Sequence, residues 1–185
     1  MQAINDFDFA ILDALQGIHN TFLNYFFAVF TYLGEAGILW IVLTFALLFY
    51  KNTSRLGLIT MTGLLSEGLF NELIIKNIVR RPRPFKIHPY VDTFVVRPNS
   101  YSFPSGHTCL AFAAATMLFL YNKKWGIAAY ITAVLIAFSR NYFYIHYPTD
   151  VIAGMLEGIL IGVVNTFVMN KIFERLDSKK TAEEV

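Results

Sequence analysis

The sequence predicts an all-α fold: an integral membrane bundle of six transmembrane helices with an N-terminal interfacial helix. Hydrophobic residues make up 56% of the 185 residues, charged residues make up 15%, and the mean hydropathy is +0.50. A soluble domain contains about 45–50% apolar and about 25% charged residues, so this chain has more apolar surface than its interior can bury. The apolar residues are also grouped into segments of roughly bilayer-crossing length. These observations exclude a typical soluble enzyme, a disordered chain and a nucleic-acid-binding module.

The N-terminal segment is amphipathic. Apolar side chains recur at helical spacing over residues 4–18, and three aspartates lie among them. This pattern is typical of a helix that lies on the membrane surface. The segment starts with acidic residues and has no cleavage site after it, which argues against a secretory signal. Residues 1–18 are therefore expected to form the interfacial helix.

Six apolar segments follow, and a transmembrane helix needs about 20 mainly apolar residues. Because six spans return the chain to the side on which it began, both termini are expected on one side of the membrane. Residues 1–185 then form a single membrane domain that ends in a charged cytoplasmic tail, 174–185. The six helices are expected over residues 20–33, 36–50, 56–79, 105–121, 125–144 and 149–173.

The long polar stretch over residues 80–104 is expected to be an active-site loop. It is rich in proline and in basic residues, and proline blocks the continuation of a helix. Loops of this length are usually functional or disordered. Its end of the bundle is expected to hold seven basic residues against three acidic ones, a distribution that suits an anion site. The basic residues are Lys76, Arg80, Arg81, Arg83, Lys86, Arg97 and Arg140.

Three short motifs at this end suit the binding of a phosphate. Lys76, Arg83 and Arg140 can place positive charge on phosphate oxygens, arginine as a fork and lysine as a point charge. Ser105 and Gly106 open the fourth helix, where free backbone N–H groups and the positive end of the helix dipole attract anions.

Two histidines and a carboxylate complete the set. His146 and Asp150 are four residues apart, and Pro148 between them suits the first turn of a helix. A carboxylate on one imidazole nitrogen leaves the other nitrogen free to attack phosphorus, while a second histidine, His107, can protonate the leaving oxygen. Chemistry alone leaves open which histidine attacks, although the adjacent carboxylate favours His146.

The motifs Lys-x6-Arg-Pro (76–84), Pro-Ser-Gly-His (104–107) and Ser-Arg-x5-His-x3-Asp (139–150) resemble, in order and spacing, the signature of the type 2 phosphatidic acid phosphatase family. Every signature position is matched. The resemblance implies a six-helix membrane phosphatase with an extracytoplasmic site and a metal-independent phosphohistidine mechanism. It implies that His146 is the nucleophile, Asp150 its orienting partner and His107 the general acid. The residues it implies for phosphate binding are Lys76, Arg83, Ser105, Gly106 and Arg140.

We therefore expect a multi-pass phosphatase of the cell membrane whose substrate, a lipid phosphate, enters from the bilayer. Undecaprenyl diphosphate is weakly favoured as the substrate, followed by phosphatidylglycerophosphate and phosphatidate. No cofactor and no nucleic-acid partner are expected, and no metal, because the four histidines lack the spacing of a zinc site. The alternative is a non-catalytic lipid-phosphate carrier or transporter. Vanadate-dependent haloperoxidases share the signature but are soluble, which the apolar composition argues against.

Overall fold

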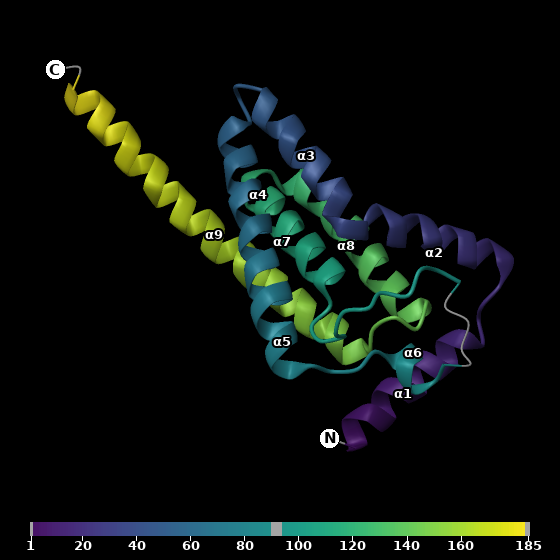
Figure 1. Ribbon diagram of the computed structural model, residues 1–185. Coiled ribbons are helices and arrows are strands. Elements are labelled where there is room, and N and C mark those ends of the chain that lie inside the picture. Colours follow the sequence, from purple (N-terminus) through teal and green to yellow (C-terminus); the bar gives the residue numbers. More distant parts are fainter. Residues whose placement is uncertain (1, 90–93, 184–185) are drawn as a thin grey trace.

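The computed structural model describes residues 2–89 and 94–183, and the regular elements in these ranges are all helical (Figure 1). The all-α prediction is confirmed. In chain order the elements are α1 (Gln2–Gln16), α2 (Thr21–Leu33), the 3₁₀ turn η1 (Glu35–Gly37), α3 (Ile38–Phe49), α4 (Ser54–Glu67), the π-helical segment η2 (Gly68–Ile75), α5 (Lys76–Val79), α6 (Pro84–Ile87), α7 (Gly106–Tyr121), α8 (Lys123–Tyr142) and α9 (Pro148–Glu183).

Helix α7 is the centre of the bundle. It packs most extensively against α9 and α8, and it also contacts α4 and α3. Its buried residues lie on all sides of the helix and include a run of three alanines, Ala113–Ala115. Small side chains allow neighbouring helix backbones to approach closely, so α7 can be surrounded by these four other helices.

A stripe of glycines on α9 makes the closest of these contacts. Gly154, Gly158 and Gly162 are spaced by four residues and therefore share one face of the helix. A Cβ atom added at Gly154 would lie 2.6 Å from the carbonyl oxygen of Ser105, and one added at Gly158 would collide with the carbonyl group of Cys109. Backbone contact thus holds the first turns of α7 and α9 side by side.

The predicted first two spans are wrong, because α2 and α3 do not run antiparallel. They form one run that is bent by 47° at η1 (Figure 1). Ala36 and Gly37 both have positive φ, +49° and +70°, and this pair of left-handed residues makes the bend. The hydroxyl group of Tyr142, at the end of α8, donates to the side chain of Asn24 near the start of α2. Helix α2 therefore lies at the end of the bundle where α8 ends and α3 begins.

The chain consequently passes along the bundle five times, as α3, α4–η2–α5, α7, α8 and α9, within the described ranges. The expectation that both termini lie on one side is also wrong. Asp8 of α1 contacts Thr149 at the start of α9, whereas the described part of the chain ends at Glu183, at the other end of that helix. Helix α9 also continues to Glu183 (Figure 1), beyond residue 173, where the sequence pattern had predicted its end.

Two helical runs in the described residues are long and apolar enough to cross a membrane, Ser54–Ile87 and Pro148–Glu183. The bent pair of α2 and α3 makes a third if it is taken as one span. Helix α7 is apolar but shorter, at 16 residues. The lengths and the apolar composition of these helices are those of membrane-spanning helices.

The glycine contact between α7 and α9 leads to a stability prediction. We expect Gly158→Ala to destabilise the protein by about 1–3 kcal/mol, because the new methyl group overpacks a backbone contact. This lowers the unfolding temperature in detergent by roughly 2–10 °C. Gly68→Ala is the matched control, since an added Cβ there meets nothing within 4 Å. Equal unfolding temperatures for the two variants would contradict the proposed role of the stripe.

Candidate active site

The turn between α8 and α9 holds His146 in a nearly closed environment. The His146 side chain is 1% exposed. The backbone N–H groups of Ile145 and His146 both donate to the carbonyl oxygen of Arg140, at 3.0 and 3.2 Å, and the Asn141 amide donates to the carbonyl oxygen of His146 at 2.9 Å. Tyr144 completes the turn with a φ of +59°. The position of the imidazole is therefore set by the backbone of its own turn.

The hydrogen bonds of His146 determine its tautomer. A guanidinium N–H of Arg83 lies 3.0 Å from Nε2 of His146, and arginine can only donate. Nε2 therefore carries the lone pair, and the proton of the neutral ring is on Nδ1. Nδ1 faces Oδ2 of Asp150 at 3.6 Å, which is longer than a hydrogen bond. Such contacts often tighten when a ligand binds.

Asp150 is held by three further donors. Its Oδ2 accepts from the Ser102 hydroxyl and from the backbone N–H of Tyr147 at 3.0 Å, and its Oδ1 accepts from Arg81 at 2.6 Å. The carboxylate is fully buried. These donors stabilise its charged form and fix its direction toward His146.

Three buried cations surround His146. Lys76, Arg83 and Arg140 are 4%, 2% and 1% exposed. Lys76 is paired with Glu72. Arg140 donates to the Thr31 hydroxyl at 2.8 Å, and its Nε has no hydrogen-bond partner.

Arg83 donates to Ser100 and to the backbone of Ile145 besides His146. Within the described residues, neither Arg83 nor Arg140 therefore forms an ion pair with a carboxylate. A buried charge without a counter-charge is costly, and an anion at this position would offset that cost.

The N-terminus of α7 faces the same space. The N–H of Ser105 donates to the backbone carbonyl of Asp150 at 3.1 Å, so it is already engaged within the protein. The first helical hydrogen bond runs from Cys109 to Ser105, which leaves the N–H groups of Gly106 and His107 at the helix start for an anion. A Cβ on Gly106 would lie 2.7 Å from a carboxylate oxygen of Glu72, the partner of Lys76, so a larger residue here would displace that side chain.

The surroundings of His146 also affect its protonation. Burial lowers the pKa of His146 well below its ordinary value, and the positive charges of Arg83, Arg140 and Lys76 lower it further. His146 is therefore neutral at neutral pH, with its Nε2 lone pair directed among cations. This is the form of imidazole that can attack an electrophile.

His107 lies in the first turn of α7 and is close enough to His146 to contribute to its electrostatics. Its Nε2 is 3.3 Å from a carboxylate oxygen of Glu35. The structure thus brings together all eight residues that the sequence predicted for the site. These are Lys76, Arg83, Ser105, Gly106, His107, Arg140, His146 and Asp150.

Sequence reasoning missed the role of Arg81. Its guanidinium bridges Asp150 and the buried carboxylate of Asp8, each at 2.6 Å, and lies 3.7 Å from the centre of the Tyr147 ring. Asp8 also accepts from the backbone and hydroxyl of Thr149. The only available signal was the position of Arg81 within the Lys-x6-Arg-Pro motif.

Other basic residues of the predicted loop lie away from this cluster. Arg80 is exposed and donates to the backbone of Asn77, and Lys86 donates to the backbone of Asn99 at 3.4 Å. Residues 90–93 of the loop are outside the described ranges. In the ranges that are described, no group of three or more His, Cys, Asp or Glu side chains is arranged to hold a metal ion.

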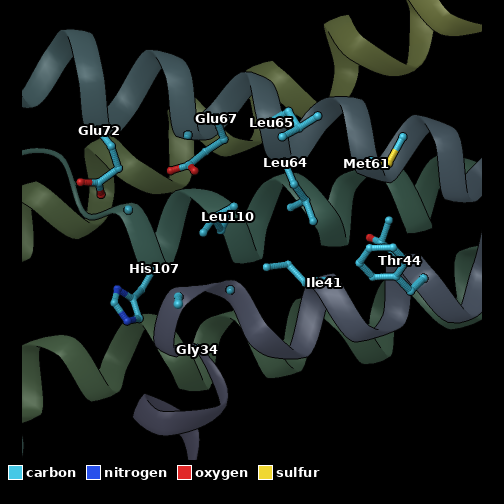
Figure 2. Close-up of a pocket in the computed structure, with 15 residues that line it drawn as sticks. Gly34, Ile41, Thr44, Met61, Leu64, Leu65, Glu67, Glu72, His107 and Leu110 are labelled. Carbon is cyan, nitrogen blue, oxygen red and sulfur yellow. The ribbon is translucent and has the colours of Figure 1, made fainter.

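A cavity of about 540 Å³ opens beside the site between α3, α4 and α7. Figure 2 shows Glu72 and His107 at one end of it and Met61 and Thr44 at the other. Its wall between these ends is mostly aliphatic, although the buried carboxyl group of Glu67 also lines it. The cavity therefore joins the charged end of the bundle to its apolar middle.

Known proteins share both the sequence pattern and this architecture. The profile of the PAP2 superfamily matches residues 53–174. An undecaprenyl-diphosphatase of Sulfolobus acidocaldarius is 34% identical over 68% of this chain and 61% of its own length. Undecaprenyl-diphosphatase BcrC of Bacillus subtilis is 29% identical over 84% of this chain and 80% of its own. The crystal structure of a transmembrane PAP2-type phosphatidylglycerolphosphate phosphatase from Bacillus subtilis superposes with a TM-score of 0.76 at 27% identity, covering 95% of this chain and 88% of that one.

The uncompensated guanidinium groups predict that the site binds a tetrahedral oxyanion. We expect inorganic phosphate to raise the unfolding temperature of the purified protein, because it binds only the folded state. Arg140→Gln should weaken this binding by about 10-fold or more, the effect of losing one charged hydrogen bond. Arg80→Gln is the control, since Arg80 is exposed and bonded elsewhere. A phosphate response that persists unchanged in Arg140→Gln would argue against the site.

Proposed function

This chain belongs to the PAP2 superfamily of membrane lipid phosphatases, and from that premise we propose that it hydrolyses a lipid phosphate or diphosphate through a phosphohistidine on His146. One observation carries the proposal. The Nε2 lone pair of His146, identified by the hydrogen bond from Arg83, lies among cations of which two lack a carboxylate partner in the described chain. A nucleophile inside an uncompensated positive site suits phosphoryl transfer.

The proposed reaction has two steps. Nε2 of His146 attacks phosphorus, the bond to the leaving oxygen breaks, and His107 donates a proton to that oxygen. His107 then takes a proton from water, whose oxygen attacks phosphorus, and the P–N bond breaks to release inorganic phosphate and restore His146. Asp150 stabilises the charge that develops on the His146 ring.

The phosphate oxygens would be bound by groups already in place. Lys76, Arg83 and Arg140 supply the positive charge that a metal ion supplies in other phosphatases. Gly106 and His107 add backbone N–H groups at the start of α7, and Ser105, whose own N–H donates to Asp150, is the residue at which that helix is capped. We propose on this basis that the reaction needs no metal ion.

The substrate class follows from the cavity beside His107. Its aliphatic wall suits a hydrocarbon chain, while its polar end lies at the phosphate site. We favour undecaprenyl diphosphate weakly as the substrate, because two of the similar proteins are undecaprenyl-diphosphatases. Phosphatidylglycerophosphate is next, being named for the similar crystal structure, and phosphatidate follows.

We further propose that the five passes are membrane spans and that the site faces away from the cytoplasm. Basic residues at the opposite end are spread over two short loops and the end of α9, as is usual for the cytoplasmic side. They are Lys51, Arg55, Lys123, Lys124, Lys171, Arg175, Lys179 and Lys180. The six spans expected from the sequence reduce to five because α2 and α3 form one bent run.

The proposal predicts how phosphate release depends on His146. Purified protein in detergent with excess EDTA is expected to release phosphate from at least one of undecaprenyl diphosphate, phosphatidylglycerophosphate, phosphatidate and a soluble phosphoester. His146→Ala should lower that rate by on the order of 1,000-fold or more, because the nucleophile is lost. Labelling with a ³²P-substrate and quenching in alkaline detergent should trap a phosphoprotein that is stable in alkali and labile in acid, in the wild type alone.

Two results would overturn this proposal. The phosphatase is excluded if His146→Ala retains the wild-type rate, or if the wild type releases no phosphate from any of the four substrates. Lipid transport that survives His146→Ala would instead favour a carrier. Loss of activity in EDTA that magnesium restores would contradict the metal-independent step.

The low pKa of His146 predicts the pH dependence. Burial, and after it the charge of Arg83, lower the pKa of His146 well below its ordinary value of 6.5. The ring therefore stays neutral when the pH falls through 6.5, and kcat/KM should decrease only at a pH well below that value. Arg83→Gln removes one of these causes, so its acidic limb should move to higher pH than that of the wild type. The comparison uses one substrate for both proteins between pH 5 and 8, so ionisation of the substrate affects both equally. Superimposable limbs would refute the electrostatic coupling.

A further inference from the structure

We propose that Glu35 is a positioning residue for His107, forming a second carboxylate–imidazole pair beside that of Asp150 and His146. The inference rests on the proposed phosphatase function. The carboxylate of Glu35 would orient the His107 ring and balance the charge of its protonated form. The sequence motifs contain no hint of it, since Glu35 lies 72 residues before His107.

The contact between the two side chains is direct. Oε2 of Glu35 lies 3.3 Å from Nε2 of His107. The Glu35 side chain is 54% exposed, and an exposed ion pair contributes little to stability. A structural reason for the contact is therefore weak, and a role in placing the imidazole is the better explanation.

The backbone next to Glu35 packs closely against the imidazole ring of His107. A Cβ atom on Gly34 would come within 3.3 Å of Cδ2 of His107 and 2.9 Å of a methyl carbon of Ile136. The backbone at Gly34 thus lies against one edge of the imidazole. Ala36 then takes a positive φ of +49°, which is rare for a residue with a side chain, and strained conformations of this kind gather at functional sites.

The charges around His107 indicate what the carboxylate of Glu35 contributes. Lys76 and Arg140 lie within electrostatic reach of His107, and positive neighbours oppose the protonated imidazole that a general acid requires. Glu35 is the carboxylate that contacts this ring in the described structure. It supplies negative charge where the proton must be held.

The pair also selects the nitrogen that exchanges the proton. With Nε2–H of His107 donated to Glu35, the proton delivered to the leaving oxygen is the one on Nδ1. After delivery, the ring is neutral and keeps its Nε2–H bond to Glu35. In the second step Nδ1 accepts a proton from the attacking water, so the pair is unchanged over the cycle.

The test compares leaving groups. A general acid matters most when the leaving oxygen is strongly basic, so we expect Glu35→Gln to lower kcat/KM for dioctanoyl phosphatidate by about 10- to 100-fold. For p-nitrophenyl phosphate, whose leaving group needs no proton, the decrease should be less than about threefold. KM should not rise, because the substitution removes a negative charge from a site that binds an anion. Glu35→Asp, which keeps the charge, should recover part of the loss, and Glu174→Gln in the distant end of α9 should match the wild type.

The outcomes separate this inference from the proposed function. If the wild type hydrolyses neither substrate, nor any of the lipids tested above, the phosphatase function itself fails. If the wild type is active and Glu35→Gln is equally active on both substrates, the positioning role is wrong while the function stands. An equal decrease on both substrates, or a loss that Glu35→Asp does not reduce, indicates a merely structural role and also overturns it.

Discussion

The structure depends on one constraint: two arginine side chains are buried almost completely away from water. Arg83 and Arg140 are nearly fully buried, and no carboxylate pairs with either one in the described chain. Burying such groups is unfavourable unless an anion or a network of dipoles compensates them. The bundle supplies part of that compensation through hydroxyl and carbonyl groups from α2, the loop and the α8–α9 turn. Under the proposed function a bound oxyanion would supply the rest, which would link stability to ligand binding.

Helix packing provides the rigidity that this arrangement needs. Glycines at every fourth position of α9 bring its backbone against α7, with Gly154 next to the carbonyl group of Ser105. At the same level the N–H of Ser105 bonds to the carbonyl group of Asp150. The start of α7 and the carboxylate beside His146 are therefore positioned by backbone contacts between α7 and α9. A larger residue in the stripe would separate them.

The N-terminal helix extends this rigid frame. Asp8 pairs with Arg81, which in turn pairs with Asp150, so α1 is connected to the site through two ion pairs whose carboxylates are buried. The placement of α1 at the site end also adds its acidic residues to that end, which reduces the predicted excess of positive charge there. Asp8 shares Arg81 with Asp150, and Asp13 accepts a hydrogen bond from Tyr144, whereas the charged neighbours that lower the pKa of His146 are Arg83, Arg140 and Lys76.

The sequence by itself determined the all-α apolar fold and the residues that meet around His146, because composition, helical spacing and short motifs are local properties. Only the tertiary structure decided the path of α2, the side on which α1 lies, and the partners Arg81, Asp8 and Glu35. The direction of the chain after a bend depends on two residues with positive φ, which the sequence pattern of Gly34–Gly37 did not reveal. Asp8 and Arg81 are 73 residues apart, and contacts over such distances arise from packing that no local pattern encodes.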